Sequence, residues 1–201
     1  MKPLIDPDIE NILSRTILPD LDKGRKDFDR QHTEAVVYWI KEILSKTSSS
    51  ESRNKILITA AYGHDWGYIG LFDDIDSANL ELVHQMKPKH MERGSKMISI
   101  LLRDKLSDYF TVEEITQVSH LVGIHDKLEE LRTEEEIILM EADTLGSIDV
   151  DKVKPTYSKA DTELMIEREI RGRRLPIFRH DWAKIEAEKL IQKRLDWYAT
   201  S

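Results

Sequence analysis

The chain has 201 residues, 40% hydrophobic and 34% charged, which is the composition of a globular protein, and we expect one domain over residues 1–201. A formal net charge of −8 argues against binding to a nucleic-acid polymer or an anionic membrane surface, because both favour clustered lysine and arginine. The absence of cysteine excludes disulfides, thiolate metal sites and a cysteine nucleophile, so any metal must bind to nitrogen and oxygen.

Apolar residues recur with a helical period along the chain, whereas alternating β-branched runs are nearly absent, which predicts an all-α fold. A short entry helix is expected near residues 7–17, and a longer amphipathic helix at about residues 27–46. After a polar loop, a helix at residues 55–65 (KILITAAYGHD) is apolar nearly all round, which predicts burial. It ends where glycine and aromatic residues begin.

A less regular segment is expected over residues 66–88, followed by an amphipathic helix over residues 90–106. Two capping boxes, Thr111 with Glu114 and Thr133 with Glu136, mark the starts of the next two helices. Two carboxyl-terminal helices are expected at about residues 157–171 and 182–198, separated by the breaker GRRLPIFRHD.

Four of the seven histidines fall in four successive predicted helices or at their ends: His32, His64, His90 and His125. A helical bundle can direct such side chains inward from facing helices. Imidazole and carboxylate bind divalent iron, manganese, nickel, cobalt or zinc when no thiolate is present. Each histidine alone is more often structural, and Asp65 alone is also consistent with an exposed helix end. In an apolar helix, however, an unpaired carboxylate is costly, and a cation is the simplest compensation.

The order of these residues resembles the HD superfamily of metal-dependent phosphohydrolases, with its H…HD…H…H…D pattern. The resemblance is carried by His32, by the doublet His64-Asp65 and by Asp143 in LMEADTLGSID. It implies that one metal ion is held by His32, His64, Asp65 and Asp143. His90 in HMERGSKM and His125 in LVGIHD would hold a second ion, with Asp65 as the bridge. His120 lies too far round the helix from His125 for both to bind easily, and we prefer His125.

The resemblance implies an HD-domain helical bundle over about residues 28–150, with a helical extension over about residues 151–201. It also implies a hydrolase that acts on a small phosphorylated metabolite, such as a nucleotide or a related phosphoester. Asp65 and His64 would be the catalytic residues. Two alternatives stay open, which are a di-iron oxygenase that cleaves a C–P or C–C bond and a regulatory HD module without catalysis.

The doublet departs from the family pattern in one position. Many relatives continue as HDxGK, whereas this chain reads HDWGY and has Tyr68 in place of the lysine. Candidate substrate-binding residues are therefore Tyr68, Arg93 and Lys89, together with Lys87 and an arginine cluster at residues 168–179. That cluster is either a phosphate clamp or a solvated helix end. His84 and His120 are candidate general acids.

The amino terminus carries acids where a signal peptide needs an apolar block, and no apolar run approaches the roughly 20 residues of a membrane span. We therefore expect a cytoplasmic protein whose partner is a small phosphorylated substrate. A homodimer is left open, as are the identity of the metal and the choice between one and two ions.

Overall fold

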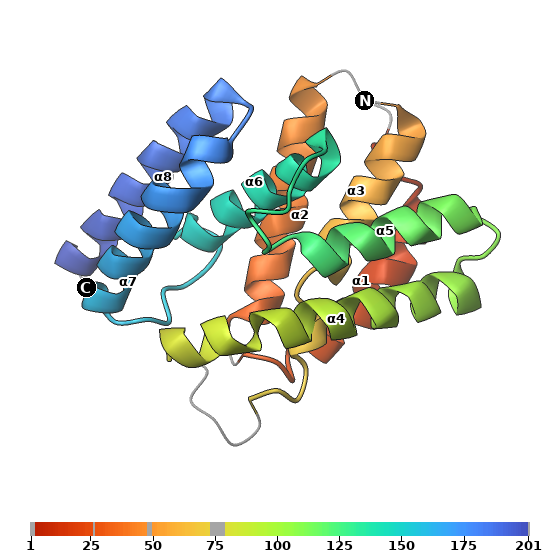
Figure 1. Cartoon of the computed structure of the whole chain (residues 1–201), viewed down its shortest axis with the longest axis horizontal. Coiled ribbons are helices and arrows are strands. Elements are labelled where there is room, and N and C mark those ends of the chain that lie inside the picture. The colour runs from red at the N-terminus through yellow and green to blue at the C-terminus, as the bar shows by residue number, and fades with distance from the viewer. Residues whose placement is uncertain (1–2, 26, 48–49, 73–78, 201) are drawn as a thin grey trace.

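The computed structural model describes residues 3–25, 27–47, 50–72 and 79–200, and these residues form helices and connecting loops without a strand (Figure 1). The predicted all-α fold is therefore confirmed. In chain order the helices are α1 (Pro7–Leu21), α2 (Asp29–Lys46), α3 (Glu51–Gly63), α4 (Leu80–Lys105), α5 (Val112–Ile124), α6 (Glu134–Ile148), α7 (Lys159–Met165) and α8 (Asp181–Thr200).

Helices α2, α3 and α6 lie at the centre of the molecule, and α2 packs closely against α6 (Figure 1). The pair α4 and α5 covers one side of this centre, while α7 and α8 lie on the other side, where α8 packs on α6. One large cluster of buried apolar residues runs from α1 to α8. None of the described helices is long and apolar enough to cross a membrane.

Both predicted capping boxes are present. The Thr111 hydroxyl accepts a hydrogen bond from the Glu114 amide at 3.2 Å, and the Glu114 carboxylate accepts one from the Thr111 amide at 3.0 Å. Thr133 and Glu136 repeat the arrangement at 3.3 and 2.8 Å. These reciprocal bonds satisfy amides that the first helical turn leaves unpaired, which is why these starts were predictable.

The start of α4 was predicted wrongly. Helix α4 begins at Leu80 rather than at residue 90, and Pro88 lies inside it. The Asn79 side chain caps the earlier start by accepting from two amides of the first turn. Val83 is buried against Tyr68 and Phe72, which anchors this turn, while Pro88 is exposed. Capping and burial therefore outweigh the hydrogen bond that proline removes.

The predicted break between the carboxyl-terminal helices is present but comes later in the breaker segment, at residues 178–180. Helix α7 first continues as a π-helix, η2 (Ile166–Arg174), and a 3₁₀ turn, η3 (Leu175–Ile177). A π-helix bonds residue i to i+5 and therefore has slightly more than four residues per turn. Met165, Ile170 and Arg174 consequently face the same side. In an α-helix, at about 100° per residue, Met165 and Arg174 would face opposite sides.

The carboxyl-terminal helices are anchored to the centre by Glu141 of α6, whose side chain is fully buried. Its carboxylate accepts hydrogen bonds from the backbone amides of Arg179 and His180, at 2.5 and 3.2 Å. The same carboxylate contacts His180 Nδ1 at 2.6 Å. A buried carboxylate with three partners fixes the start of α8 against α6.

The close contact between α2 and α6 depends on Gly146. A Cβ atom at this position would lie 2.7 Å from Val36 Cγ2 and 3.1 Å from the Val36 backbone nitrogen. We expect Gly146→Ala to lower the free energy of unfolding by about 1–3 kcal/mol, because the stiff Val36 and its backbone must move. Denaturant titration measures the effect.

Gly123→Ala in α5 is the matched control, because its Cβ would meet Ser95 at an ordinary 3.5 Å. Alanine should leave stability unchanged there or raise it by up to about 1 kcal/mol. Equal stabilities of the two variants would contradict this account of the α2–α6 contact.

Candidate metal centre

His64 and His125 each directly follow the last residue of a helix, α3 and α5 respectively. Their Nδ1 atoms lie 2.8 Å from the Ala61 carbonyl oxygen and 2.9 Å from the Val122 carbonyl oxygen. Because a carbonyl oxygen only accepts, Nδ1–H must be the donor, and in the neutral ring Nε2 keeps its lone pair. The chain thus uses one local device twice to direct an Nε2 atom into the interior.

Two groups of buried ligand atoms result among the described residues, and in each group the atoms lie within 4.8 Å of one another. In the first group, His32 Nε2 lies 3.1 Å from His64 Nε2 and 2.9 Å from Asp143 Oδ1. In the second, His90 Nε2 lies 3.3 Å from His125 Nε2 and 3.4 Å from Asp65 Oδ1. The structure therefore brings together all six residues that the sequence pattern indicated as ligands.

The Asp65 carboxylate lies between the two groups. Its Oδ2 atom is 3.6 Å from the Nε2 atoms of both His32 and His64. Its Oδ1 atom is 3.4 Å from His90 Nε2 and 3.8 Å from His125 Nε2. Each oxygen faces a different group, which is the arrangement expected of a bridging ligand.

The donor set fits a divalent transition metal. Burial lowers the pKa of His64 to about 4, so this imidazole is neutral at pH 7. Its Nε2 lone pair faces oxygens of Asp65 and Asp143 at 3.6 and 3.8 Å, and lone pairs facing each other are unfavourable without a cation. Imidazole nitrogen and carboxylate oxygen suit manganese, iron, cobalt, nickel and zinc.

Aromatic rings hold two of the histidines in place. Phe28 stacks on His32 with ring centroids 5.0 Å apart, and Tyr68 stacks on His90 at 3.9 Å. The Arg25 guanidinium lies over the Tyr68 ring, 4.1 Å from its centroid. Burial raises the pKa of Tyr68, so the phenol stays protonated at neutral pH. Tyr68, at the lysine position of HDxGK, therefore packs between a histidine of the second group and an arginine.

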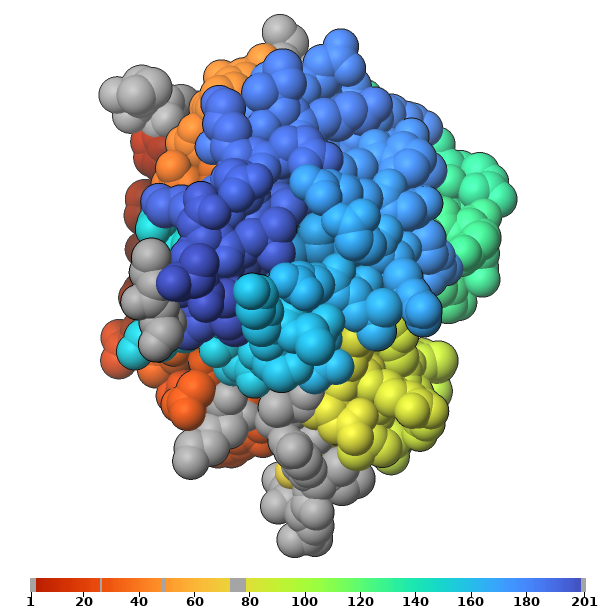
Figure 2. Space-filling view, turned by 90° about the vertical axis from the view of Figure 1, so that its left-hand side faces the viewer, coloured from red at the N-terminus to blue at the C-terminus, as the bar shows by residue number. Residues whose placement is uncertain are grey.

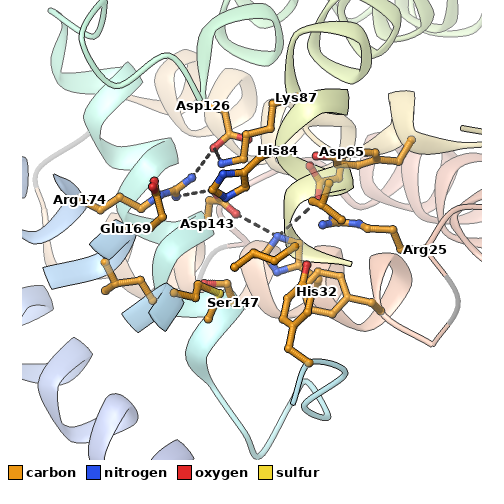
Figure 3. Close-up of a pocket in the computed structure, with 17 residues that line it drawn as sticks. Arg25, His32, Asp65, His84, Lys87, Asp126, Asp143, Ser147, Glu169 and Arg174 are labelled. Carbon is orange, nitrogen blue, oxygen red and sulfur yellow. Dashed lines mark hydrogen bonds and ion pairs between the residues drawn. The ribbon is translucent and has the colours of Figure 1, made fainter. Parts of the chain in front are cut away.

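Two buried arginines neutralise the carboxylates (Figure 3). Arg25 donates to Asp65 Oδ2 at 2.5 Å, and Arg174 donates to Asp143 Oδ2 at 2.7 Å and also to Asp126. Burial raises the pKa of both Asp65 and Asp143, but the adjacent arginines and histidines outweigh it and hold each pKa well below its usual range. Both carboxylates are therefore ionised and able to bind metal.

Beside the two groups lies a cavity of about 90 Å³, which we call the inner cavity (Figure 3). Its lining comes from α2, η1 (Trp66–Tyr68), α4, α6, the end of α7, the π-helix and the intervening loops. The lining residues are Arg25, Phe28, His32, Asp65, Tyr68, Leu80, Val83, His84, Lys87, Asp126, Asp143, Ser147, Tyr157, Met165, Glu169, Ile170 and Arg174.

Two predicted substrate contacts, Arg93 and Lys89, are absent from this lining, and Lys89 is exposed. Helix geometry gives the reason. Relative to His90, the lining residue Lys87 lies about 60° to one side on α4, whereas Arg93 and Lys89 lie about 60° and 100° to the other. His120 also lies away from the inner cavity. Its half-exposed side chain contacts Glu136 instead, with 2.7 Å between His120 Nε2 and Glu136 Oε1.

Sequence reasoning missed Arg25 and Asp126 altogether. Asp126 follows His125 as Asp65 follows His64, and this second doublet was the available signal. Arg25 carried no signal, because it lies in the loop before α2, outside any motif. Arg174 was indicated only as one member of the arginine cluster.

A protein-family model described as the HD domain matches residues 30–147, more than half of the chain. The chain belongs to the HD domain family. Comparisons with curated proteins and with solved structures found no match. HD domains bind divalent metals and are generally metal-dependent hydrolases. In this HD domain all six residues of the two groups lie within the matched range, whereas Arg25 and Arg174 lie outside it.

The number of metal ions that a variant keeps should depend on which ligand group the substitution affects. We expect His90→Gln to lose the ion of the second group and to keep that of the first, because only one ligand group is damaged. Asp65→Ala should lose both ions or bind both weakly, because its oxygens face both groups. Elemental analysis after dialysis measures the stoichiometry. His120→Gln is the control and should match the unmodified protein, and equal metal content in all variants would contradict the assignment.

Proposed function

We propose that this HD protein is a metal-dependent phosphohydrolase that acts on a small phosphorylated metabolite, such as a nucleotide or a related phosphoester. The proposal rests chiefly on one observation, the position of Asp65 with one oxygen toward each histidine group, directly beside the inner cavity. Two divalent ions held in this way would supply Lewis-acid stabilisation of a phosphoryl oxygen and a lowered pKa for a water nucleophile.

The charges of the inner cavity support an anionic substrate once metal is bound. Its lining contains three cationic side chains, Arg25, Lys87 and Arg174. Four anionic side chains accompany them, namely Asp65, Asp126, Asp143 and Glu169. With neutral histidines, the lining carries a net charge of −1. One bound divalent ion would therefore make its net charge positive. The cavity is therefore suited to a phosphoryl group only in the metal-bound protein.

The cationic side chains would orient the phosphoryl group. A guanidinium has five N–H donors, and the described bonds from the Arg174 side chain to Asp143, Thr144 and Asp126 involve only its Nη1 and Nη2 groups. Lys87 reaches the cavity from α4 and lies 3.2 Å from Asp126 Oδ1. This helix thus provides a cationic side chain at the cavity, where the HDWGY motif has Tyr68 instead of a lysine.

The proposal predicts hydrolysis of phosphomonoesters in the presence of manganese, iron, cobalt or nickel. We expect Asp65→Ala to lower kcat/KM by about a thousandfold or more, which corresponds to about 4 kcal/mol of transition-state stabilisation. A phosphate-release assay across a broad panel measures it, with His120→Ala as the control. Turnover that requires dioxygen and ferrous iron would instead indicate the di-iron oxygenase, and no turnover of any phosphoester or phosphonate would indicate a regulatory module.

Arg174 should matter for both the metal ligand and the substrate. We expect Arg174→Gln to lower kcat/KM about 10- to 100-fold, because Asp143 loses the partner that orients it. Arg171→Gln is the matched control, since Arg171 lies in the same π-helix but forms exposed pairs with Glu167 and Glu188. Equal activity of the two variants would show that Arg174 has no role in the reaction.

A further inference from the structure

A second and larger cavity, of about 690 Å³, adjoins the inner cavity, and we call it the outer cleft. It lies between the first turns of α4 and the segment formed by α7 and the start of the π-helix, which meet on one face of the molecule (Figure 2). Its lining residues are Asn79, Leu80, Glu81, His84, Asp161, Leu164, Met165, Arg168 and Glu169. Its volume lies within the range of about 300–1,000 Å³ that is typical of small-molecule sites.

The two cavities are continuous at four residues. Leu80, His84, Met165 and Glu169 line both of them. His84 is half-buried at this junction, next to Lys87 and Glu169 of the inner cavity (Figure 3). A molecule whose phosphoryl group occupies the inner cavity would therefore extend past His84 into the outer cleft.

The charge of the outer cleft differs from that of the inner cavity. Its described lining contains three carboxylates, Glu81, Asp161 and Glu169, against one arginine, Arg168. Glu169 is paired with Arg173 at 2.9 Å, and Asp161 accepts a hydrogen bond from the Ser158 hydroxyl at 2.7 Å. Glu81 is exposed at the first turn of α4.

The lining also has apolar surface, from Leu80, Leu164 and Met165. Leu164 is 40% exposed, so part of this surface faces the open cleft. A second phosphate or a carboxylate of the substrate would meet mostly negative charge here. A neutral or amine-bearing group with some carbon surface would meet complementary chemistry.

We propose that the outer cleft binds the alcohol part of the substrate and selects monophosphate esters of neutral or amine-bearing alcohols over esters that carry a second anionic group. This inference rests on the proposed phosphohydrolase function for its assignment of the phosphoryl end. It makes Glu81, Asp161 and Glu169 specificity-determining residues. Nucleoside di- and triphosphates would be disfavoured relative to monophosphates by the same charges.

Three small esters that differ in charge at the far end test the proposal: phosphoethanolamine with an amine, glycerol 3-phosphate with hydroxyls, and 3-phosphoglycerate with a carboxylate. With manganese present, we measure kcat/KM for each ester that is hydrolysed and Kd by calorimetry for each that is not. The first two should be preferred over 3-phosphoglycerate by about three- to tenfold or more, as expected for partly exposed charges. The preference should weaken as salt is added.

Glu81→Lys should reduce or reverse this preference without loss of the metal. The matched control is Glu92→Lys, which makes the same change of charge on the same helix, at an exposed residue paired with Lys96 outside both cavities. Equal shifts from the two variants would overturn the proposal, because the effect would then reflect net charge alone.

The outcomes separate this inference from the proposed function. Hydrolysis without any preference among the three esters, or with a preference for 3-phosphoglycerate, would overturn the role of the outer cleft and leave the phosphohydrolase standing. Binding in the expected order without hydrolysis would support the cleft and count against the hydrolase. Absence of both binding and hydrolysis would overturn both.

Discussion

Charge burial is the constraint on which this structure depends. Asp65 and Asp143 are buried carboxylates, and an unpaired buried charge costs several kcal/mol. The guanidiniums of Arg25 and Arg174 pair with these carboxylates, and both arginines come from outside the range that the HD domain model matches. The loop before α2 and the π-helix after α7 therefore complete the electrostatics of the HD core.

The geometry of the centre comes from helix ends and close backbone contacts. His64 and His125 are oriented by carbonyl groups of their own last helical turns, so the direction of each ring is set locally. Gly67, two residues after Asp65, then lets the chain approach α4. A Cβ atom there would lie 1.9 Å from the His90 carbonyl oxygen, so only glycine allows the doublet and His90 to approach so closely.

The two adjoining cavities have different charges, and this difference connects the structure to the choice of substrate. The inner cavity combines metal ligands with Arg25, Lys87 and Arg174, whereas the outer cleft has an excess of carboxylates. The π-helix contributes to both, because its wide turn brings Glu169 and Arg174 to the same side as Met165. A substrate that is anionic at one end only would match this arrangement.

Much of this organisation follows from local signals in the chain. Capping boxes begin α5 and α6, because a side chain can satisfy the amides three residues away whatever the rest of the fold does. The six candidate ligands were predicted from their order along successive helices, through resemblance to a family pattern, and the structure places them in two groups that could each hold a metal ion. The start of α4 at Leu80 and the π-helix at Ile166–Arg174 were not predicted. Lys89 and Arg93, predicted as substrate contacts, do not line the inner cavity.

The sequence by itself determined the all-α class, most helix positions and the residue types able to bind metal, because these depend on apolar period, caps and side-chain chemistry. Only the tertiary structure decided which cations reach the carboxylates, where the cavities lie and how Tyr68 is used. Arg25 and Asp65 are forty residues apart, yet their side chains are in contact. Such contacts arise when elements that are distant in the sequence pack together. A buried carboxylate then requires a partner, and no local sequence pattern indicates which residue will provide it.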